Sequence, residues 1–329
     1  MDRTTTATRP PLGVRLLSPL LSREPDWSAM TPDDLAAFRT AENRKRRSAA
    51  IRLIAGFPDR GAAITWQQVA LDGRVLPVRV HRPGRGAGTG SAPLPLVLHV
   101  HGGGFVGTAP QSDWINSHLA ARLPAVVVSV DHRLLTHRIP LSAAVDDGWD
   151  ALQHLARYAA HWGIDADRIA VLGESAGATV AALSALRARG AGPDLRAQVL
   201  VNPCVDLTAT ALEYPSVTEH ADSPTLTVPQ IEFFRRLAVP EGVDPRTVSP
   251  LHAGDHGGLA PALVVVPTLD PLADHGRAYA ERLLRAGSPA RLSEHPGAVH
   301  AFLSLPRLVP RAEDARTDIL RFLEEHLAP

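Results

Sequence analysis

Short apolar runs recur between residues 94 and 267 and are separated by stretches with helical periodicity. These runs lack polar alternation, which is typical of strands that helices cover on both faces. The pattern predicts an α/β fold with a central, mostly parallel sheet, helices on both faces and right-handed crossovers. The runs are LPLVLHV, AVVVSV, RIAVLG, AQVLVNP and PALVVVP.

Two earlier runs and two amphipathic stretches complete this domain. AITWQQVAL and RVLPVRVHRP are joined by Asp72-Gly73, a dipeptide favoured in tight hairpins, and predict two paired strands. Residues 141–163 have helical periodicity and end at Gly163, as helices commonly do. The C-terminal stretch predicts a last helix packed on the sheet. Its apolar stripe consists of Ile319, Leu320, Leu323 and Leu327.

Two regions fall outside this strand and helix alternation. Residues 1–60 look helical, because Thr31 can cap a helix and Pro32 suits its first position. Residues 205–250 lie between two predicted strands and are longer than an ordinary connection. We expect residues 1–60 to form an N-terminal helical cap and residues 205–250 to form a second cap insertion within a main domain of residues 61–329.

Charge and composition exclude several classes of function. Lys plus Arg and Asp plus Glu both number 34, so the formal net charge is zero. This balance argues against a nucleic-acid binder and against a polybasic membrane-surface protein. The run Arg44-Lys45-Arg46-Arg47 is therefore predicted to be a solvated helix face. No apolar stretch reaches the roughly 18 residues needed to span a bilayer, so we expect a cytoplasmic protein without a signal peptide.

The single cysteine and one pair of histidines are predicted to be structural. Cys204 excludes an intrachain disulfide, and its apolar surroundings indicate a small buried side chain rather than a catalytic thiol. His252 and His256 flank Asp255 at a spacing that suits a metal only on a helix. The neighbouring glycines disfavour a helix there, so a surface loop is predicted. We expect neither a metal nor a cofactor.

The segment Gly173-Glu174-Ser175-Ala176-Gly177 has the pattern GxSxG and lies between a predicted strand and a predicted helix. A nucleophile on a tight strand-to-helix turn needs small neighbours, because the strained backbone brings other chain segments close. The alternative is an ordinary turn in which the serine caps the helix. The strand and helix on either side favour the nucleophile.

Three consecutive glycines follow the predicted strand LPLVLHV, in the segment His101-Gly102-Gly103-Gly104-Phe105. Glycines leave backbone N–H groups unshielded, so these groups can point at the oxyanion of a tetrahedral intermediate. A flexible turn is the alternative, although such a turn does not ordinarily separate a buried strand from an aromatic residue.

A nucleophilic serine needs a base, and the base needs an orienting carboxylate. His300 lies between a strand-like run and the last helix, and Asp270 follows the strand PALVVVPTL. The order serine, aspartate, histidine is the one used by enzymes whose nucleophilic serine lies on such a strand-to-helix turn. Asp274 and His295 are rivals, but Asp274 falls inside the next helical pattern and His295 at the end of a strand-like run.

These motifs together resemble the hormone-sensitive-lipase-like family of α/β-hydrolases, which includes bacterial carboxylesterases and acetyl hydrolases. The similarity extends over roughly residues 64–329, through HGGGFV, VVVSVDHRL, IPLSAAVDD, GESAGA, SPLHAG and HPGAVHAF. The resemblance implies a catalytic triad, an oxyanion hole made of N–H groups, and residues that shape its loop. The implied triad is Ser175, Asp270 and His300. The implied oxyanion donors are the N–H groups of Gly103, Gly104 and Ala176, and the implied loop-shaping residues are His101 and Gly102.

The sequence departs from the family pattern in three places. Glu174 stands where an aspartate is usual, and Ala178 stands where a glycine is usual. The larger departure follows Asp131, where the family's Tyr-x-Leu-Ala-Pro-Glu stretch is replaced by HRLLTH at residues 132–137. That change affects the local support of the glycine-rich loop but removes no catalytic group.

The function expected from this sequence is hydrolysis of short-chain acyl esters through an acyl-enzyme. Two alternatives stay open: a pathway-specific deacetylase or acyltransferase with the same triad, and a ligand-binding receptor on a catalytically dead scaffold. The expected partner is a small-molecule ester, with no nucleic acid and no membrane. The oligomeric state is open, a homodimer being one alternative. Acyl-chain preference is expected to depend on cap residues, among them Trp27, Phe38, Phe233 and Phe234.

Overall fold

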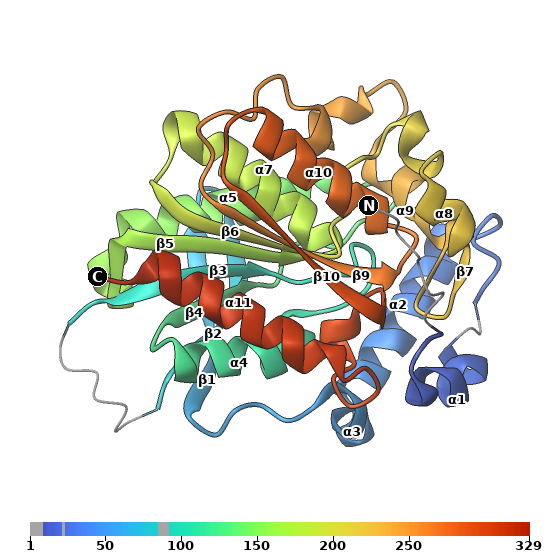
Figure 1. Ribbon diagram of the computed structural model, residues 1–329, viewed down its shortest axis with the longest axis horizontal. Helices are drawn as coiled ribbons and strands as arrows, with labels where there is room; N and C mark the ends of the chain where they lie inside the picture. The colour runs from blue at the N-terminus through green and yellow to red at the C-terminus, as the bar shows by residue number, and fades with distance from the viewer. Residues whose placement is uncertain (1–8, 22–23, 85–91) are drawn as a thin grey trace, which may run out of the picture.

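A computed structural model describes residues 9–21, 24–84 and 92–329, and its centre is an eight-stranded sheet (Figure 1). The strand order is β1-β2-β4-β3-β5-β6-β9-β10. The strands are β1 (Ala62–Leu71), β2 (Arg74–Pro83), β3 (Leu94–Val100), β4 (Val126–Val130), β5 (Ile164–Glu174), β6 (Leu195–Val201), β9 (Ala262–Leu269) and β10 (Ala290–Val299).

The sheet is mostly parallel, as the sequence predicts. Strand β2 pairs antiparallel with both β1 and β4, and every other neighbouring pair is parallel. The β1–β2 hairpin turns at Asp72-Gly73, with Leu71 opposite Arg74 in register. Because β3, β5, β9 and β10 run in one direction, the residues that follow them lie at the same edge of the sheet.

Helices cover both faces of the sheet. On one face, α5 (Leu141–Arg157), α6 (Ala159–Trp162), α7 (Ala176–Ala191) and α10 (Ala273–Arg285) pack on the buried side chains of the central strands. On the other face lie α4 (Asp113–Arg122) and α11 (Arg311–Leu327). Figure 1 shows these two layers above and below the sheet. In α11 the predicted stripe is buried at Ile319, Leu323 and Leu327, and Leu320 is partly buried.

One predicted helix is divided in two. The stretch 141–163 forms α5 and α6, which are separated at Tyr158, where φ is −108° and ψ is 31°. Gly163 ends α6 in the left-handed region, with φ 60°. The helical region therefore ends at Gly163 as predicted, whereas the prediction of one continuous helix over residues 141–163 is wrong.

The two regions outside the alternation gather at one end of the sheet (Figure 1). The N-terminal region contains α1 (Leu12–Leu21), α2 (Pro32–Arg47) and α3 (Arg52–Ala55). The region after β6 contains α8 (Pro215–Glu219), the short strands β7 (Asp222–Ser223) and β8 (Leu226–Thr227), and α9 (Val228–Ala238). Thr31 caps α2 in a capping box with Asp34, and Pro32 occupies the first helical turn.

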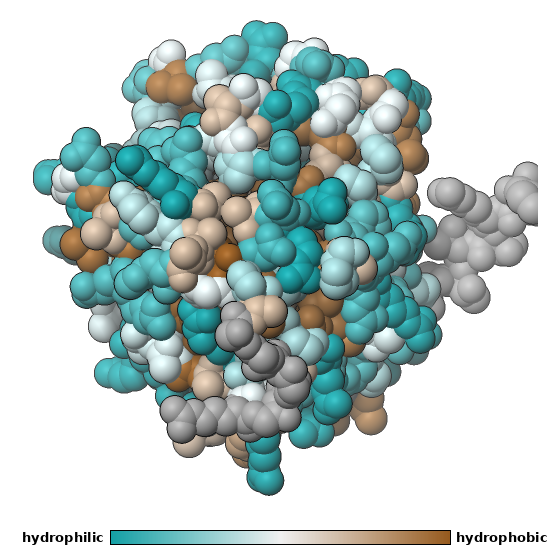
Figure 2. Space-filling model, turned by 90° about the vertical axis from the view of Figure 1, so that its left-hand side faces the viewer, coloured by the Kyte–Doolittle hydropathy of each residue, from teal (hydrophilic) through white to brown (hydrophobic). Residues whose placement is uncertain are grey.

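A cluster of aromatic rings joins these two regions to the chain that follows β3. Trp27 lies between Phe38 of α2, Phe105 and Phe233 of α9, with ring centroids 5.2, 5.5 and 5.2 Å away. Phe105 and Phe233 also meet edge to face at 5.3 Å. Such pairs stabilise beyond simple burial. The opposite end of the molecule, which carries the C-terminus, is mainly hydrophilic with scattered apolar residues (Figure 2).

Candidate active site

Ser175 occupies a strained turn between β5 and α7. Its φ of 52° and ψ of −118° lie where non-glycine residues are rare. The two glycines of the motif permit this turn. A Cβ on Gly173 would lie 2.3 Å from the Gly177 carbonyl oxygen, and a Cβ on Gly177 would lie 2.2 Å from that of Val100. The strain and the close packing together lift the serine out of the end of the strand.

Ser175, His300 and Asp270 form a hydrogen-bonded chain at the edge of the sheet. His300 Nε2 lies 2.9 Å from Ser175 Oγ, and His300 Nδ1 lies 2.8 Å from Asp270 Oδ2. When Nδ1 carries the proton, its N–H donates a hydrogen bond to Asp270, and Nε2 can accept the hydrogen bond of the serine hydroxyl. The backbone N–H of Leu272 donates to the other Asp270 oxygen at 2.8 Å. Asp270 is fully buried, and only 4% of His300 is exposed.

Each of these residues follows directly after a strand. Ser175 comes after β5, Asp270 after β9 and His300 after β10, while His101 follows β3. The parallel sheet therefore brings Ser175 and His300 into contact although they lie 125 positions apart. The structure unites the three residues that the sequence analysis proposed as a triad.

The glycine loop, residues 101–107, lies beside the serine turn. A Cβ on Gly104 would lie 3.3 Å from the Ala176 Cβ, and one on Gly102 would lie 3.4 Å from the Ser175 Cβ. Gly103 has a φ of 78° and lies so close to the Val106 carbonyl that a side chain would clash. Within the described residues, the N–H groups of Gly103, Gly104 and Ala176 donate to no protein acceptor.

The segment that departs from the family pattern supports this loop directly. The His132 ring stacks on His101 with centroids 4.2 Å apart, and its Nε2 lies 3.2 Å from the His101 carbonyl oxygen. The N–H of Leu135 donates to the Gly104 carbonyl at 2.8 Å. HRLLTH thus supplies its own contacts in place of the expected stretch. The sequence analysis did not identify His132 or Leu135 in this role.

Helix α2 holds the glycine loop from the other side. Arg39 donates to the carbonyl oxygens of Phe105 at 2.7 Å and Leu135 at 2.5 Å. One turn further on, Asn43 Oδ1 accepts the N–H of Gly107 at 3.0 Å. The spacing of four residues places both side chains on one helix face. Nothing in the sequence alone indicated which loop that face would meet.

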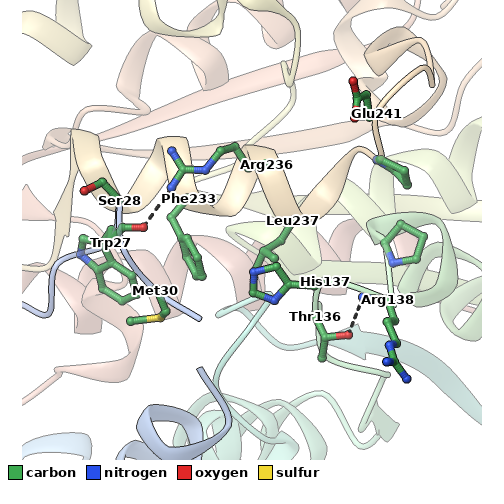
Figure 3. Close-up of a pocket in the computed structure, with 12 residues that line it drawn as sticks. Trp27, Ser28, Met30, Thr136, His137, Arg138, Phe233, Arg236, Leu237 and Glu241 are labelled. Atoms are coloured by element: carbon green, nitrogen blue, oxygen red, sulfur yellow. Dashed lines mark hydrogen bonds between the residues drawn. The ribbon is translucent and has the colours of Figure 1, made fainter. Parts of the chain in front are cut away.

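A cavity of about 1070 Å³ opens over Ser175 and His300. Its walls come from the glycine loop, the serine turn and both regions outside the alternation. Of the four cap aromatics named from the sequence, Trp27, Phe38 and Phe234 line it. Phe233 instead faces a smaller cavity of about 510 Å³ (Figure 3).

The smaller cavity lies between α9 and the chain around residues 136–140. Figure 3 shows Arg236 reaching from α9 to the Trp27 carbonyl oxygen, a hydrogen bond of 3.0 Å. Trp27 lines both cavities, so its ring forms part of the wall between them. Neither Ser175 nor His300 contributes to this cavity.

The rival acid and base lie outside the hydrogen-bonded chain. Asp274 accepts the N–H of Ser216 at 2.9 Å and pairs with Arg277 at 2.8 Å. His295 Nε2 lies 3.1 Å from the Ser293 hydroxyl. Both are therefore engaged elsewhere, in agreement with their lower rank in the sequence analysis.

The predicted surface loop at residues 252–258 needs a correction. His252 lies 3.2 Å from Asp206, but His256 is buried, with Nε2 2.8 Å from the Pro250 carbonyl oxygen. Across the described ranges, no cluster of three or more His, Cys, Asp or Glu side chains has an arrangement that would hold a metal ion. Cys204 is buried as predicted, and burial raises the pKa of its thiol to about 12.

The basic run at the end of α2 also differs in part from its prediction. Arg44, Lys45 and Arg47 are exposed, as expected for a solvated helix face. Arg46 is partly buried and lines the large cavity, and its Nη1 donates to Gln111 Oε1 at 3.1 Å. Lys45 and Arg47 also line this cavity, so three of the four residues border the candidate site and only Arg46 is partly buried there.

Buried histidines predict how stability depends on pH. Burial lowers the pKa of His101 well below its ordinary value, and the neighbouring His132 adds to the effect. Burial also lowers the pKa of His81 and of His275. Such groups take up protons on unfolding once the pH falls below the unfolded pKa of about 6.5, which favours the unfolded state.

We therefore expect the free energy of unfolding, measured in urea titrations, to fall between about pH 7.5 and about pH 5.5. Carboxylates with lowered pKa values, such as Asp113, lose their contribution only at lower pH. An equal or higher free energy at the lower pH would contradict this expectation.

A serine on a strained strand-to-helix turn, beside glycine N–H groups and an Asp-oriented histidine, defines the α/β-hydrolase class of site. A family model described as alpha/beta hydrolase fold matches residues 97–304, and the chain belongs to that family. The resemblance to its hormone-sensitive-lipase-like members is confirmed by the relatives that the chain matches.

Among these relatives is the esterase LipI of Mycobacterium tuberculosis, 40% identical over 200 residues, which are 59% of this chain and 61% of that protein. The match thus spans less than two thirds of LipI. The ethyl acetate hydrolase of Pseudomonas putida is 34% identical over 259 residues, covering 76% of this chain and 79% of that one. An ester hydrolase structure from the Lake Arreo metagenome superposes with a TM-score of 0.85 at 30% identity, covering 97% and 99% of the two chains.

Proposed function

We propose that the protein is a serine carboxylester hydrolase that acts on short-chain acyl esters. The observation that carries this proposal is the chain Ser175–His300–Asp270, with contacts of 2.9 and 2.8 Å, at the floor of a cavity. Relatives named esterase, carboxylesterase and ethyl acetate hydrolase support it. In that role Ser175 is the nucleophile, His300 the general base and Asp270 the orienting acid.

The reaction follows from these positions. Ser175 Oγ attacks the ester carbonyl while His300 Nε2 takes the hydroxyl proton, and Asp270 stabilises the imidazolium that forms. His300 then gives the proton to the leaving alcohol, and the acyl group stays on Ser175. A water molecule that gives its proton to His300 attacks the acyl-enzyme and releases the acid.

The oxyanion is assigned to the N–H groups of Gly103, Gly104 and Ala176. Within the described chain these groups have no protein acceptor, so they are free to receive a developing negative charge. His101 and Gly102 shape the loop. The His101 Nδ1–H donates to the Gly102 carbonyl oxygen at 2.9 Å, which helps to fix the loop conformation.

We further propose that residues 1–60 and 205–250 act as a cap over residues 61–329. Support comes from the cavity lining, to which the first region contributes Trp27 and Phe38 and the second contributes Phe234. A cavity lined by aromatic and polar side chains suits the apolar and polar parts of a small ester. The homodimer alternative and the cytoplasmic location stay predictions. In the part of the chain that the structure describes, the helices lack the length and apolar character needed to cross a bilayer.

The contacts of α2 predict a positioning effect. Replacing Arg39 by Met removes two hydrogen bonds to the chain around the glycine loop. We expect kcat for p-nitrophenyl acetate to fall about 10- to 100-fold with a smaller change in KM, because small displacements of oxyanion donors act on the transition state.

The exposed Arg44 provides the matched control, and Arg44→Met should retain the parent kcat. Active sites are counted by titration with a phosphonate, so loss of folded protein is not mistaken for loss of kcat. A rise in KM at constant kcat in Arg39→Met would contradict the positioning role.

The function is tested with purified protein and p-nitrophenyl esters of increasing acyl length. We expect hydrolysis that is fastest for acetate or butyrate and that a serine-directed phosphonate abolishes. A catalytically dead receptor would bind such esters without turnover. Faster acyl transfer to an added alcohol than to water would favour the acyltransferase alternative instead.

A further inference from the structure

Arg46 is a cation inside the large cavity that has no carboxylate partner among the described residues. Its Nη1 donates to the neutral side chain of Gln111 at 3.1 Å, and its Nε is buried without a hydrogen-bond partner. Glu42 is the acidic neighbour that interacts electrostatically with the Arg46 guanidinium. That carboxylate, however, lies 2.5 Å from Lys45 Nζ. Burial lowers the pKa of Arg46, as expected for a desolvated charge.

The rest of the cavity mouth is also rich in unpaired cations. Arg47 and Arg52 line it, and within the described chain neither forms an ion pair. The acidic residues of the lining are already engaged by the protein. Glu24 accepts from Trp27 and Thr227, Asp113 pairs with Arg79, Glu42 pairs with Lys45, and Glu174 accepts from Ser112. Five Lys or Arg and four Asp or Glu side chains line the cavity, so the lining carries one net positive charge, while the chain as a whole is neutral.

Arg46 is also connected to the reaction centre. Gln111 accepts from Arg46 through Oε1 and donates to the Gly102 carbonyl through Nε2 at 3.2 Å. The guanidinium is thus one side chain away from the loop that faces Ser175. Ser175 and Arg46 line the same cavity, so an ester bound at Ser175 occupies the space that this charge borders.

A partly buried guanidinium without a carboxylate partner carries a desolvation cost, and a ligand that brings a carboxylate offsets that cost through charge-assisted hydrogen bonds. We propose that the cavity binds ester substrates carrying an anionic group, such as a carboxylate, away from the scissile bond, and that Arg46 is the residue that binds it. This inference rests on the proposed esterase function and names its substrate class.

The test compares substrates that differ only in charge. One pair is para-acetoxybenzoate and para-acetoxybenzamide, which place the anion or its neutral amide on the alcohol part. The other is monomethyl glutarate and its primary amide, which place it on the acyl part. For each protein, the ratio of kcat/KM for the anionic member to that for the amide is measured.

We expect the parent protein to favour the anionic member of at least one pair by about 10-fold. Arg46→Gln should lower that ratio to about one, and Arg46→Lys should retain part of it, because a charge remains but the planar fork is lost. Arg44→Gln is the matched control. Arg44 belongs to the same basic run but is exposed and outside the cavity lining, so its ratio should equal that of the parent.

The ratio separates binding of an anion from a purely structural role. If Arg46 only ties α2 to Gln111, Arg46→Gln slows both members of a pair equally and leaves the ratio unchanged, which would overturn the inference. The parent could instead cleave the ester bond of the amide-bearing substrates with a kcat/KM equal to that for the anionic ones. That result would overturn the inference and leave the esterase function in place. If the parent hydrolyses none of the four esters and no p-nitrophenyl ester either, both the inference and the esterase function are overturned.

Discussion

The Ser175→Ala variant is expected to lose about 10⁶-fold in kcat for p-nitrophenyl acetate, leaving a residual acceleration of about 10³ to 10⁴ over water. The loss is large because alanine removes the atom that forms the acyl-enzyme, while the cavity and the free N–H groups of the glycine loop stay in place. Alanine tolerates the turn no worse than serine does, so the fold should persist. Burst and steady-state kinetics at saturating substrate measure the effect.

Ser184 offers a matched control for this variant. It lies in α7, the helix that follows Ser175, and its side chain is buried outside the cavity lining. Ser184→Ala should keep the parent kcat. A Ser175→Ala protein that turns over at the parent rate would remove the nucleophile assignment altogether.

The second large effect is expected for Asp270→Asn, which should lower kcat by about 10⁴-fold. Asparagine has nearly the same shape, but its amide cannot stabilise the imidazolium. Its NH2 group, placed toward Nδ1, favours the proton on the wrong ring nitrogen of His300. The comparison is made as kcat against pH, with the folded state checked by thermal unfolding.

Asp274→Asn is the control for the orienting acid. Asp274 contacts Ser216 and Arg277 and has no contact with His300, so this variant should stay within a few-fold of the parent in kcat. A large loss of kcat in Asp274→Asn together with the parent kcat in Asp270→Asn would show that the orienting acid had been assigned to the wrong carboxylate.

The parts of the fold that the sequence predicted are those governed by local pattern. Uninterrupted apolar runs identified the parallel strands β3, β4, β5, β6 and β9, because strands covered on both faces need no polar side chains. Ser175 and Asp270 were recognisable because each comes directly after such a run, at the edge of the sheet, whereas His300 follows a strand-like run that contains polar residues. Ser175 had the strongest signal, since Gly173 and Gly177 are required by close backbone contacts.

The parts that the sequence left hidden depend on contacts between distant segments. Arg39 and Phe105 are 66 residues apart, and Arg46 and Gln111 are 65 apart, so no local pattern relates either pair. The basic run was therefore interpreted by its charge alone, and the turn of α2 that directs Arg46 into the cavity was missed. His256 was missed for the same reason, because its burial depends on how a glycine-containing loop folds back on Pro250.

The most direct test of the central claim is mass spectrometry of the protein after reaction with a serine-directed phosphonate, followed in parallel by esterase assays. We expect one phosphonyl adduct per chain, located on the peptide that contains Ser175, with activity falling in proportion to labelling. Full labelling of Ser175 with undiminished hydrolysis, or an adduct on another residue that tracks the loss of activity, would contradict it.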